Sequence, residues 1–250
     1  KEFAYLSDSG DVLYAVRKFD HYGELSGKVL DDLESGSRVD VDESKRDPLD
    51  FVLWKRAKPE EPSWNSPWGE GRPGWHIECS AMSRALFGER FDIHGGGLDL
   101  AFPHHENEKA QSCSLCGSED CFAQIWMHNE MLQVEGKKMS KSLGNFFSVR
   151  DLLDQGIPGE VIRFVYLSTH YRKPMDWTEK KAKEAEDILE KWALFTDEIE
   201  ASNVLDEGVS RALADDLNTA GAISEMHKMA KEGRYAELKS AIRFMALETQ

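Results

Sequence analysis

The chain has 250 residues, of which 40% are hydrophobic and 31% charged, a balance typical of a globular protein with a sizeable core. Every apolar run falls short of the roughly 20 residues that a membrane-spanning helix needs, so we expect a cytoplasmic protein without membrane contact. The formal net charge of −15 disfavours nucleic-acid binding over the whole surface, so a nucleic-acid partner would require a local basic patch, for which the candidates are Arg163, His170, Arg172 and Lys173.

The first part of the chain is predicted to form a hairpin and, later, a connecting loop. Residues 3–16 alternate in hydrophobicity around Asp8-Ser9-Gly10, which predicts two antiparallel strands joined by a turn. Residues 57–74 hold four prolines, and this density favours a loop over a regular element. Three tryptophans in or beside the loop are expected to anchor it by packing: Trp54, Trp64 and Trp68.

From Gly74 onward, short apolar runs alternate with helical periodicity. The predicted order is a strand ending at Cys79, a helix over 80–87 with Ser80 as its N-cap, a strand over 91–93, a helix over 103–112 and a strand over 124–128. This alternation is typical of an α/β domain with a parallel sheet. A short pair of strands around Met131–Val134 then leads into a lysine-rich loop.

Three residues of this segment have the chemistry of a zinc site. Pro103 suits the first turn of a helix, on which His104 and Glu108, four residues apart, share one face. Cys79 is expected at the carboxyl end of a parallel strand, where ligands commonly bind. Sulfur, imidazole and carboxylate suit zinc better than calcium or magnesium. From spacing alone, an ordinary helix pair beside a small core cysteine stays open as the alternative.

The other three cysteines form a C-x2-C-x4-C pattern, which we expect in a loop around Gly117. They are Cys113, Cys116 and Cys121. Three interpretations stay open: free thiols in a surface loop, a second metal site that would need a further ligand, and a redox pair.

Residues 138–145, KMSKSLGN, have the composition of a mobile loop that binds phosphate. Lys138 and Lys141 bring two compact positive charges into one small volume, where they can neutralise a polyphosphate during a reaction. The serines can donate hydrogen bonds to phosphate oxygens, and Gly144 gives the backbone freedom to move. An isolated K-x-x-K is usually a solvated turn, but the string KMSKS is far rarer.

After residue 147 the chain is predicted to be helical. Ser148 and Asp151 have the spacing of a capping box, and Gly156 with Pro158 ends that helix. A third helix begins at Thr178, and one apolar stripe on it predicts a bundle core. The apolar positions are Val161, Phe164, Val165 and Leu167 on the second helix and Ile188, Trp192, Phe195 and Ile199 on the third.

Longer strings tie these patterns to a known family. The chain resembles cysteinyl-tRNA synthetase, a class I aminoacyl-tRNA synthetase, in GRPGWHIECSAM (71–82), FDIHGGGLDLAFPHHENEKAQS (91–112) and KMSKSLGNF (138–146). The strings KRDPLDFVLWK (45–55) and EPSWNSPWGEGRPGW (61–75) extend the similarity, which runs from Gly10 to about Asp187 and is weaker beyond.

The resemblance implies an α/β fold, namely the second half of a class I Rossmann-type catalytic domain with a β-containing insertion, followed by an α-helical bundle. It also implies four segments: an insertion over 1–73, the second half of the catalytic domain over 74–147, stem-contact junction helices over 148–185 and the start of a helical tRNA-binding domain over 186–250.

The resemblance implies the following site residues. The zinc ligands correspond to Cys79, His104 and Glu108, with a fourth on a segment outside this chain, and the zinc binds the sulfur of the substrate. Lys138 and Lys141 neutralise the leaving pyrophosphate. The expected contacts to ATP are Lys138, Met139, Ser140, Lys141, Ser142 and His94.

Two further residues are expected at the substrate. Trp75 would wall the cysteine pocket, and Asp99 would hold the substrate ammonium, because a buried ammonium needs a carboxylate partner. Asp99 as a helix or loop cap, and His94 as a structural histidine, stay open as alternatives.

The implied reaction joins cysteine to ATP, supplied with Mg²⁺, and passes the cysteinyl group to tRNA(Cys), in an enzyme that we expect to be a monomer. The family's HIGH signature and the zinc-binding cysteine that accompanies it have no counterpart here. We therefore expect an internal segment of a longer enzyme, lacking also most of the C-terminal domain and inactive by itself.

Three alternatives remain at this point. A ligase of the mycothiol pathway would use the same cysteinyl-adenylate chemistry with an amino-sugar acceptor. A zinc module without catalysis would need no lysine loop. A tRNA-binding paralogue that has lost its active site would explain a missing HIGH segment.

Overall fold

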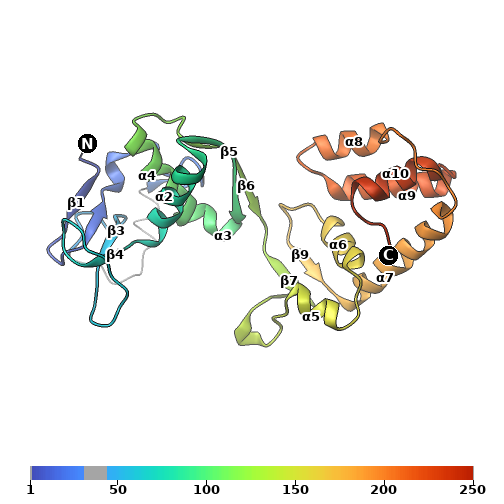
Figure 1. Cartoon of the computed structure of the whole chain (residues 1–250), viewed down its shortest axis with the longest axis horizontal. Helices are drawn as coiled ribbons and strands as arrows, with labels where there is room; N and C mark the ends of the chain where they lie inside the picture. Colours follow the sequence, from blue (N-terminus) through green and yellow to red (C-terminus); the bar gives the residue numbers. More distant parts are fainter. Residues whose placement is uncertain (1, 31–43, 250) are drawn as a thin grey trace. The chain divides into compact units, whose positions relative to one another are not determined.

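The computed structural model describes residues 2–30 and 44–249, and the chain divides into two compact units, Lys1–His128 and Asn129–Gln250. Figure 1 colours the first unit from blue to green and the second from yellow-green to red. Among the described residues, no helix combines the length and hydrophobicity that crossing a membrane requires.

A four-stranded antiparallel sheet opens the first unit. Its strands, in spatial order, are β1 (Ala4–Leu6), β2 (Val12–Tyr14), β3 (Phe51–Arg56) and β4 (Gly71–Pro73), with the short 3-10 helix η1 (Val16–Lys18) after β2. The predicted hairpin is confirmed, since Ala4 pairs with Tyr14, and Gly10 adopts a φ of +87° in the turn.

The segment predicted as a loop over 57–74 ends in a strand, so that prediction is wrong for residues 71–73. Gly71 pairs with Arg56, and a Cβ at Gly71 would lie 2.3 Å from Nε1 of Trp54, so only glycine permits this approach. Pro73 is tolerated because β4 is an edge strand. The predicted anchoring by Trp64 and Trp68 is also wrong, because these side chains are 59% and 52% exposed.

Helices and a two-stranded sheet complete the first unit. In chain order they are α2 (Trp75–Phe87), β5 (Arg90–Gly97), α3 (Leu98–Leu100), the irregular turn η2 (Ala101–His105), α4 (Glu106–Cys116) and β6 (Phe122–Asn129), and β5 pairs with β6. The predicted strands over 91–93 and 124–128 are confirmed within β5 and β6, and the helix predicted over 103–112 is confirmed from Glu106 onward, in α4. Because α4 continues to Cys116, the prediction of a loop at Cys113 and Cys116 is wrong.

The strand predicted to end at Cys79 is wrong, because α2 begins directly at Trp75. Gly74 is the N-cap in an extended conformation, and its N–H donates to the carbonyl of Leu53 at 2.8 Å. A Cβ at Gly74 would lie 2.1 Å from the carbonyl oxygen of Val52, so glycine lets the chain turn from the sheet straight into the helix. Ser80 is therefore not an N-cap; its buried hydroxyl lies within α2 and donates to Gln111 at 2.5 Å.

The core of the first unit lies between the antiparallel sheet and α4. The hydroxyl of Tyr14 donates to the carbonyl of Ala110 at 3.1 Å and contacts the hydroxyl of Ser114 at 2.6 Å, which ties β2 to α4. The buried members of this core are Tyr14, Val16, Phe19, Tyr22, Phe51, Ala110, Cys113 and Cys121. This packing holds α4, and the residues that it presents, against a rigid support.

The second unit begins with a small mixed sheet in the order β8-β7-β9. Its strands are β7 (Leu132–Val134), β8 (Lys137–Lys138) and β9 (Met175–Trp177). The predicted pair at Met131–Val134 is confirmed as the antiparallel pairing of β7 with β8, and β7 runs parallel to β9. This sheet is therefore mixed, and it lies outside residues 74–128, for which the alternating pattern predicted a parallel sheet.

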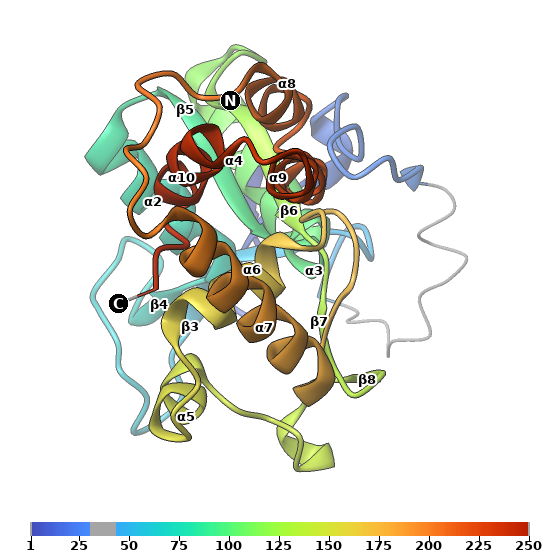
Figure 2. The ribbon, with the colours of Figure 1, turned by 90° about the vertical axis from the view of Figure 1, so that its right-hand side faces the viewer.

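Helices form the rest of the second unit. After the short 3-10 helix η3 (Lys141–Leu143) they are α5 (Val149–Asp154), α6 (Gly159–Leu167), α7 (Glu179–Thr196), α8 (Glu207–Ala214), α9 (Thr219–Glu232) and α10 (Tyr235–Phe244). In Figure 2, α6 lies along α7, and α10 packs on both α7 and α9. The capping box of Ser148 and Asp151 is confirmed, with both reciprocal hydrogen bonds present.

The bundle core matches the predicted stripe only in part. Trp192, in the C-terminal part of α7, is 2% exposed, whereas Phe195 is half-buried and stacks on Tyr235 with ring centroids 5.1 Å apart. Ile199 lies beyond the end of α7 and is 36% exposed, so its place on the stripe is wrong. Helix α7 ends at Thr196, and a period of 3.6 carries no meaning past the last helical residue.

Candidate metal and substrate site

The structure brings Cys79, His104 and Glu108 together in the first unit. Cys79 comes from α2, His104 from η2 and Glu108 from α4, and their ligand atoms all lie within 4.8 Å of one another. Nε2 of His104 lies 2.8 Å from Oε1 of Glu108, as the spacing of four residues on one helical face predicts. The cysteine reaches them because α2 packs against α4.

Glu108 is the strongest sign that a cation belongs here. Its side chain is fully buried, and among the described residues neither carboxylate oxygen has a hydrogen-bond partner. Nε2 of His94 and Nε2 of His104 lie 3.1 and 2.8 Å from the carboxylate, but neither imidazole donates a well-aligned hydrogen bond to it. A buried carboxylate without such bonds is costly unless a cation compensates it. The donor set therefore fits a zinc ion.

Protonation in the metal-free protein follows from burial. Burial raises the pKa of the Cys79 thiol, and the nearby carboxylate of Glu108 raises it further. Burial lowers the pKa of His104, although Glu108 opposes that shift. The imidazole of His104 is thus neutral and able to bind a cation, while the thiol of Cys79 would lose its proton only when a cation binds its sulfur.

Aromatic side chains surround the three donors. Trp75, the first residue of α2, stacks on His104 with ring centroids 4.4 Å apart and an interplanar angle of 28°, and it is 59% exposed. One face of Trp75 therefore supports His104, and much of the ring remains open to solvent. Asp99, on the short helix α3, is also exposed.

Sequence reasoning missed three histidines of this site: His76, His105 and His128. Nδ1 of His76 lies 2.8 Å from Nδ1 of His104, and Nδ1 of His105 lies 2.8 Å from Nε2 of His128. Burial lowers the pKa of His76 to about 4 and that of His105 to about 3, so both rings are neutral at neutral pH. His105 and His94 also form, with Glu108, a second group of possible metal ligands. The only sequence signal was the abundance of histidine within residues 76–128, since these residues lie on separate elements.

The three glycines after His94 serve close packing. A Cβ at Gly96 would lie 3.0 Å from Cε1 of His105, and a Cβ at Gly97 would lie 2.4 Å from Oδ1 of Asp99. Glycine at these positions therefore leaves room for the histidine and for the carboxylate. His94 itself contacts Glu108 and packs edge-on against Trp126, with ring centroids 5.1 Å apart.

The lysine loop belongs to the second unit, where Lys138 ends β8 and is exposed. The side chain of Asn145 holds this loop closed, because its Nδ2 donates to the carbonyl of Lys138 at 3.1 Å and its Oδ1 accepts from the N–H of Ser140 at 2.9 Å. The side chain of Lys141 lies outside the described residues. Gly144 has a φ of +66°, which a glycine adopts without strain.

Comparison with known proteins decides the family. A family model described as tRNA synthetases class I (C) catalytic domain matches residues 1–187. The chain belongs to this family. The class I synthetase domain thus contains both the three donors and the lysine loop, and a DALR domain model matches residues 208–245, over α8 to α10.

Relatives of this class I synthetase chain carry a common name. A cysteine--tRNA ligase from Ruegeria pomeroyi is 63% identical over 246 residues, which cover 96% of this chain and 52% of the relative. Cysteine--tRNA ligases from Jannaschia sp. and Paracoccus denitrificans are each 61% identical over 247 residues, covering 99% of this chain and 54% and 53% of theirs. The chain spans about half the length of the curated relatives it matches.

Basic residues that the sequence suggested as a nucleic-acid patch are partly engaged inside this synthetase chain. Nε of Arg163 donates to the carbonyl of Met245 at 2.6 Å, and Nε of Arg172 lies 2.8 Å from a carboxylate oxygen of Asp216. These contacts join α6 and the segment before β9 to the helices near the end of the chain. Arg163 and Arg172 therefore have structural partners within the second unit.

Proposed function

We propose that the full-length protein is a cysteine--tRNA ligase, which activates cysteine with ATP and transfers it to tRNA(Cys). The observation that carries the proposal is the convergence of a thiol, an imidazole and an orphaned buried carboxylate, at Cys79, His104 and Glu108, in a chain about 60% identical to proteins with that name. A shared name alone would not say where the chemistry occurs, and the donors supply that location.

Zinc is the cation that these donors suit, and when bound it would supply a Lewis acid that prefers the thiolate of the substrate. Cys79, His104 and Glu108 would hold it, together with the fourth protein ligand that the family resemblance places on a segment outside this chain, and the sulfur of the substrate would bind the same ion. With Nε2 of His104 as the ligand atom, its Nδ1 carries the proton and donates to Nδ1 of His76, which is neutral and can accept. His76 would therefore orient the imidazole.

This donor set would explain selection of cysteine over serine. A serine hydroxyl is a poorer zinc ligand than a thiolate and is much harder to ionise. A site that depends on one specific bond rejects an analogue lacking that bond far better than a hydrophobic pocket rejects a missing methylene. Separate hydrolytic editing of serine would then be unnecessary.

The remaining groups of the substrate would be recognised by Asp99 and Trp75. Asp99 presents an exposed carboxylate on α3, within the same unit as the donors, and a carboxylate is the natural partner of the cysteine ammonium. Trp75 is fixed by stacking on His104 and would wall the pocket. Its indole would exclude water from one side of the bound amino acid.

The lysine loop would act on ATP. Lys138 and Lys141 would neutralise the charge that develops on the leaving pyrophosphate, and Met139, Ser140 and Ser142 would contribute the rest of the loop's contact with the nucleotide. We keep His94 as a proposed ATP contact, although its Nε2 also lies 3.1 Å from Glu108. Adenylate formation requires little covalent work from the protein, so positioning and charge stabilisation would supply most of the rate.

The test is transfer of radiolabelled cysteine to tRNA by the full-length protein, with ATP, Mg²⁺ and zinc present. We expect transfer together with cysteine-dependent exchange of pyrophosphate into ATP. Exchange without transfer would contradict the tRNA acceptor and would point to an amino sugar. Absence of exchange would leave a non-catalytic paralogue.

A further inference from the structure

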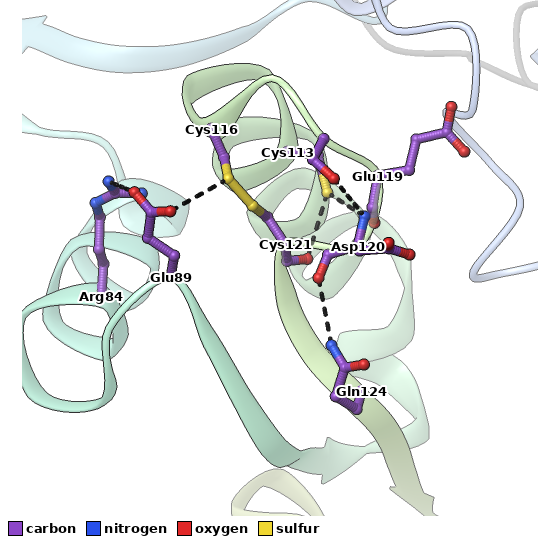
Figure 3. Close-up of a disulfide and its surroundings, with 9 residues drawn as sticks. Arg84, Glu89, Cys113, Cys116, Glu119, Asp120, Cys121 and Gln124 are labelled. Atoms are coloured by element: carbon purple, nitrogen blue, oxygen red, sulfur yellow. Dashed lines mark hydrogen bonds and ion pairs between the residues drawn. A yellow bond between two sulfur atoms is a disulfide. The ribbon is translucent and has the colours of Figure 1, made fainter.

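Two of the three remaining cysteines are joined across the turn between α4 and β6. Cys116 is the last residue of α4, Cys121 directly precedes β6, and the structure links them by a disulfide with a Cα–Cα separation of 6.5 Å (Figure 3). This separation lies within the range that disulfides span without movement of the backbone.

Gly117 creates this approach. It ends α4 in the left-handed conformation, with a φ of +84°, and its N–H donates to the carbonyl of Cys113 at 2.7 Å. The chain then needs only residues 117–120 to return to Cys121. The ring closed by the disulfide is therefore short, and a short ring removes little entropy from the unfolded chain. A cross-link of this kind contributes little to holding the fold.

Burial distinguishes Cys116 from the other two cysteines of this segment, Cys113 and Cys121. Cys113, one turn before Cys116 on α4, is 3% exposed, and burial raises the pKa of its thiol. Its Sγ lies 3.5 Å from the carbonyl oxygens of Glu119 and Cys121, to which the S–H can donate. Cys116 is more exposed than either Cys113 or Cys121, so an external reagent reaches Cys116 first.

A carboxylate stands beside the accessible sulfur. Oε2 of Glu89 lies 3.7 Å from Sγ of Cys116, and its other oxygen is paired with Arg84, as Figure 3 shows. In the reduced protein, Glu89 can accept the hydrogen of the Cys116 thiol. The negative charge of Glu89 also disfavours the thiolate, and so slows its reaction.

We propose that Cys116 and Cys121 form a reversible thiol–disulfide site that reacts with low-molecular-weight disulfides of the glutathione class. The Cys116 thiolate attacks one sulfur of glutathione disulfide, forming a mixed disulfide and releasing one glutathione thiolate. The Cys121 thiolate then attacks Sγ of Cys116 and releases the second. The two cysteines lose two electrons to the two sulfurs of glutathione disulfide, and the two thiol protons of the cysteines pass to the released glutathione thiolates.

Reduction of the disulfide would loosen the turn between Cys116 and Cys121 without unfolding the rest of the first unit. Glu119, inside the ring, lies 2.5 Å from Nε2 of His21 through Oε1, and its carbonyl faces the thiol of Cys113. We expect the reduced protein to exchange amide hydrogens faster within residues 117–121, with unchanged protection in α4. A reagent of moderate oxidising strength could thus change this surface without unfolding the unit.

The test uses the full-length protein, reduced and then equilibrated with mixtures of glutathione and glutathione disulfide. After acid quenching, N-ethylmaleimide labelling and digestion, mass spectrometry of the peptide that holds Cys116 and Cys121 should show the loss of two hydrogens and no label on either residue. Dithiothreitol should restore both labels. Cys113→Ser is the matched control and should leave the cross-link intact, whereas Cys116→Ser and Cys121→Ser should abolish it.

Glu89→Gln tests whether the carboxylate slows the reaction of Cys116, and it leaves both sulfurs in place. It should speed the reaction of Cys116 about twofold, because the thiolate becomes more populated while its nucleophilicity falls slightly. Two results would overturn the proposal. One is the absence of the cross-link at every glutathione ratio. The other is a second equivalent of zinc in the reduced protein that Cys116→Ser and Cys121→Ser remove, because Glu89, Cys116 and Cys121 would then be a metal site.

Discussion

Replacing Cys79 with serine should weaken zinc binding by a factor of about 10² to 10³. The Cys79 sulfur is one of three donors whose ligand atoms lie within 4.8 Å of one another. A full set of four ligands binds zinc with roughly 10–16 kcal/mol at pH 7, so one ligand accounts for about 2.5–4 kcal/mol. Since 1.4 kcal/mol is a factor of ten, the loss corresponds to two to three orders of magnitude.

The measurement is competition between the full-length protein and a chelator of known zinc affinity, followed by calorimetry of cysteine binding. The variant should lose affinity for zinc and for cysteine together, because the substrate sulfur would bind to the same ion. Cys113→Ser is the control, since it removes a sulfur of the same unit that is more deeply buried than that of Cys79 and is not among the three donors.

Zinc affinity within twofold of the wild type would refute the assignment of Cys79. Loss of cysteine affinity with zinc retained would refute the coupling between metal and substrate. A similar loss in Cys113→Ser would show that the effect arises from damage to the core of the first unit.

Three further outcomes are expected. Lys141→Ala should slow cysteine-dependent pyrophosphate exchange about 100-fold while changing the Kd of cysteine less than about twofold, because the lysine charge acts mainly in the transition state. Single-turnover kinetics measure the rate and calorimetry measures the Kd, and a loss confined to cysteine binding would contradict that role. Gly97→Ala should raise the KM for cysteine more than it lowers kcat, because the new Cβ would lie 2.4 Å from Oδ1 of Asp99 and displace that carboxylate. Steady-state kinetics measure both constants, and an unchanged KM would contradict the role of Asp99 in binding cysteine. Asp206 is the N-cap of α8, and its bond to Arg234 holds the pKa of this carboxyl below its ordinary value. The carboxylate therefore stabilises the bundle above about pH 4, and that stability is lost as the pH falls through the lowered pKa. Urea unfolding at several pH values should show a shallower acid dependence in Asp206→Asn, which keeps an N-cap residue, and equal slopes would refute the linkage.

Local patterns in the sequence predicted much of the architecture. The turn at Gly10, the capping box of Ser148 and Asp151, and the shared face of His104 and Glu108 all depend on residues within a few positions of one another. Such features follow from backbone geometry and from helical periodicity, which are present before any tertiary contact forms.

Long-range contacts account for the errors. The apolar run before Ser80 suits a strand or a helix, and what selects the helix is Gly74, which packs on the carbonyl of Val52 more than 20 residues earlier. Exposure of Trp64 likewise depends on how its loop lies against β4, to which it is joined by a bridge at Gly71. Neither contact is visible in a window of neighbouring residues.

The sequence by itself determined the chemical kinds of group available, namely a thiol, several imidazoles, a carboxylate and a lysine pair, and their resemblance to one family. Only the tertiary structure decided that His76 meets His104, that His128 meets His105, and that Glu108 is buried without a hydrogen-bond partner among the described residues. The physical reason is that residue type is a local property, whereas burial and the pairing of polar groups arise when elements distant in the chain pack together.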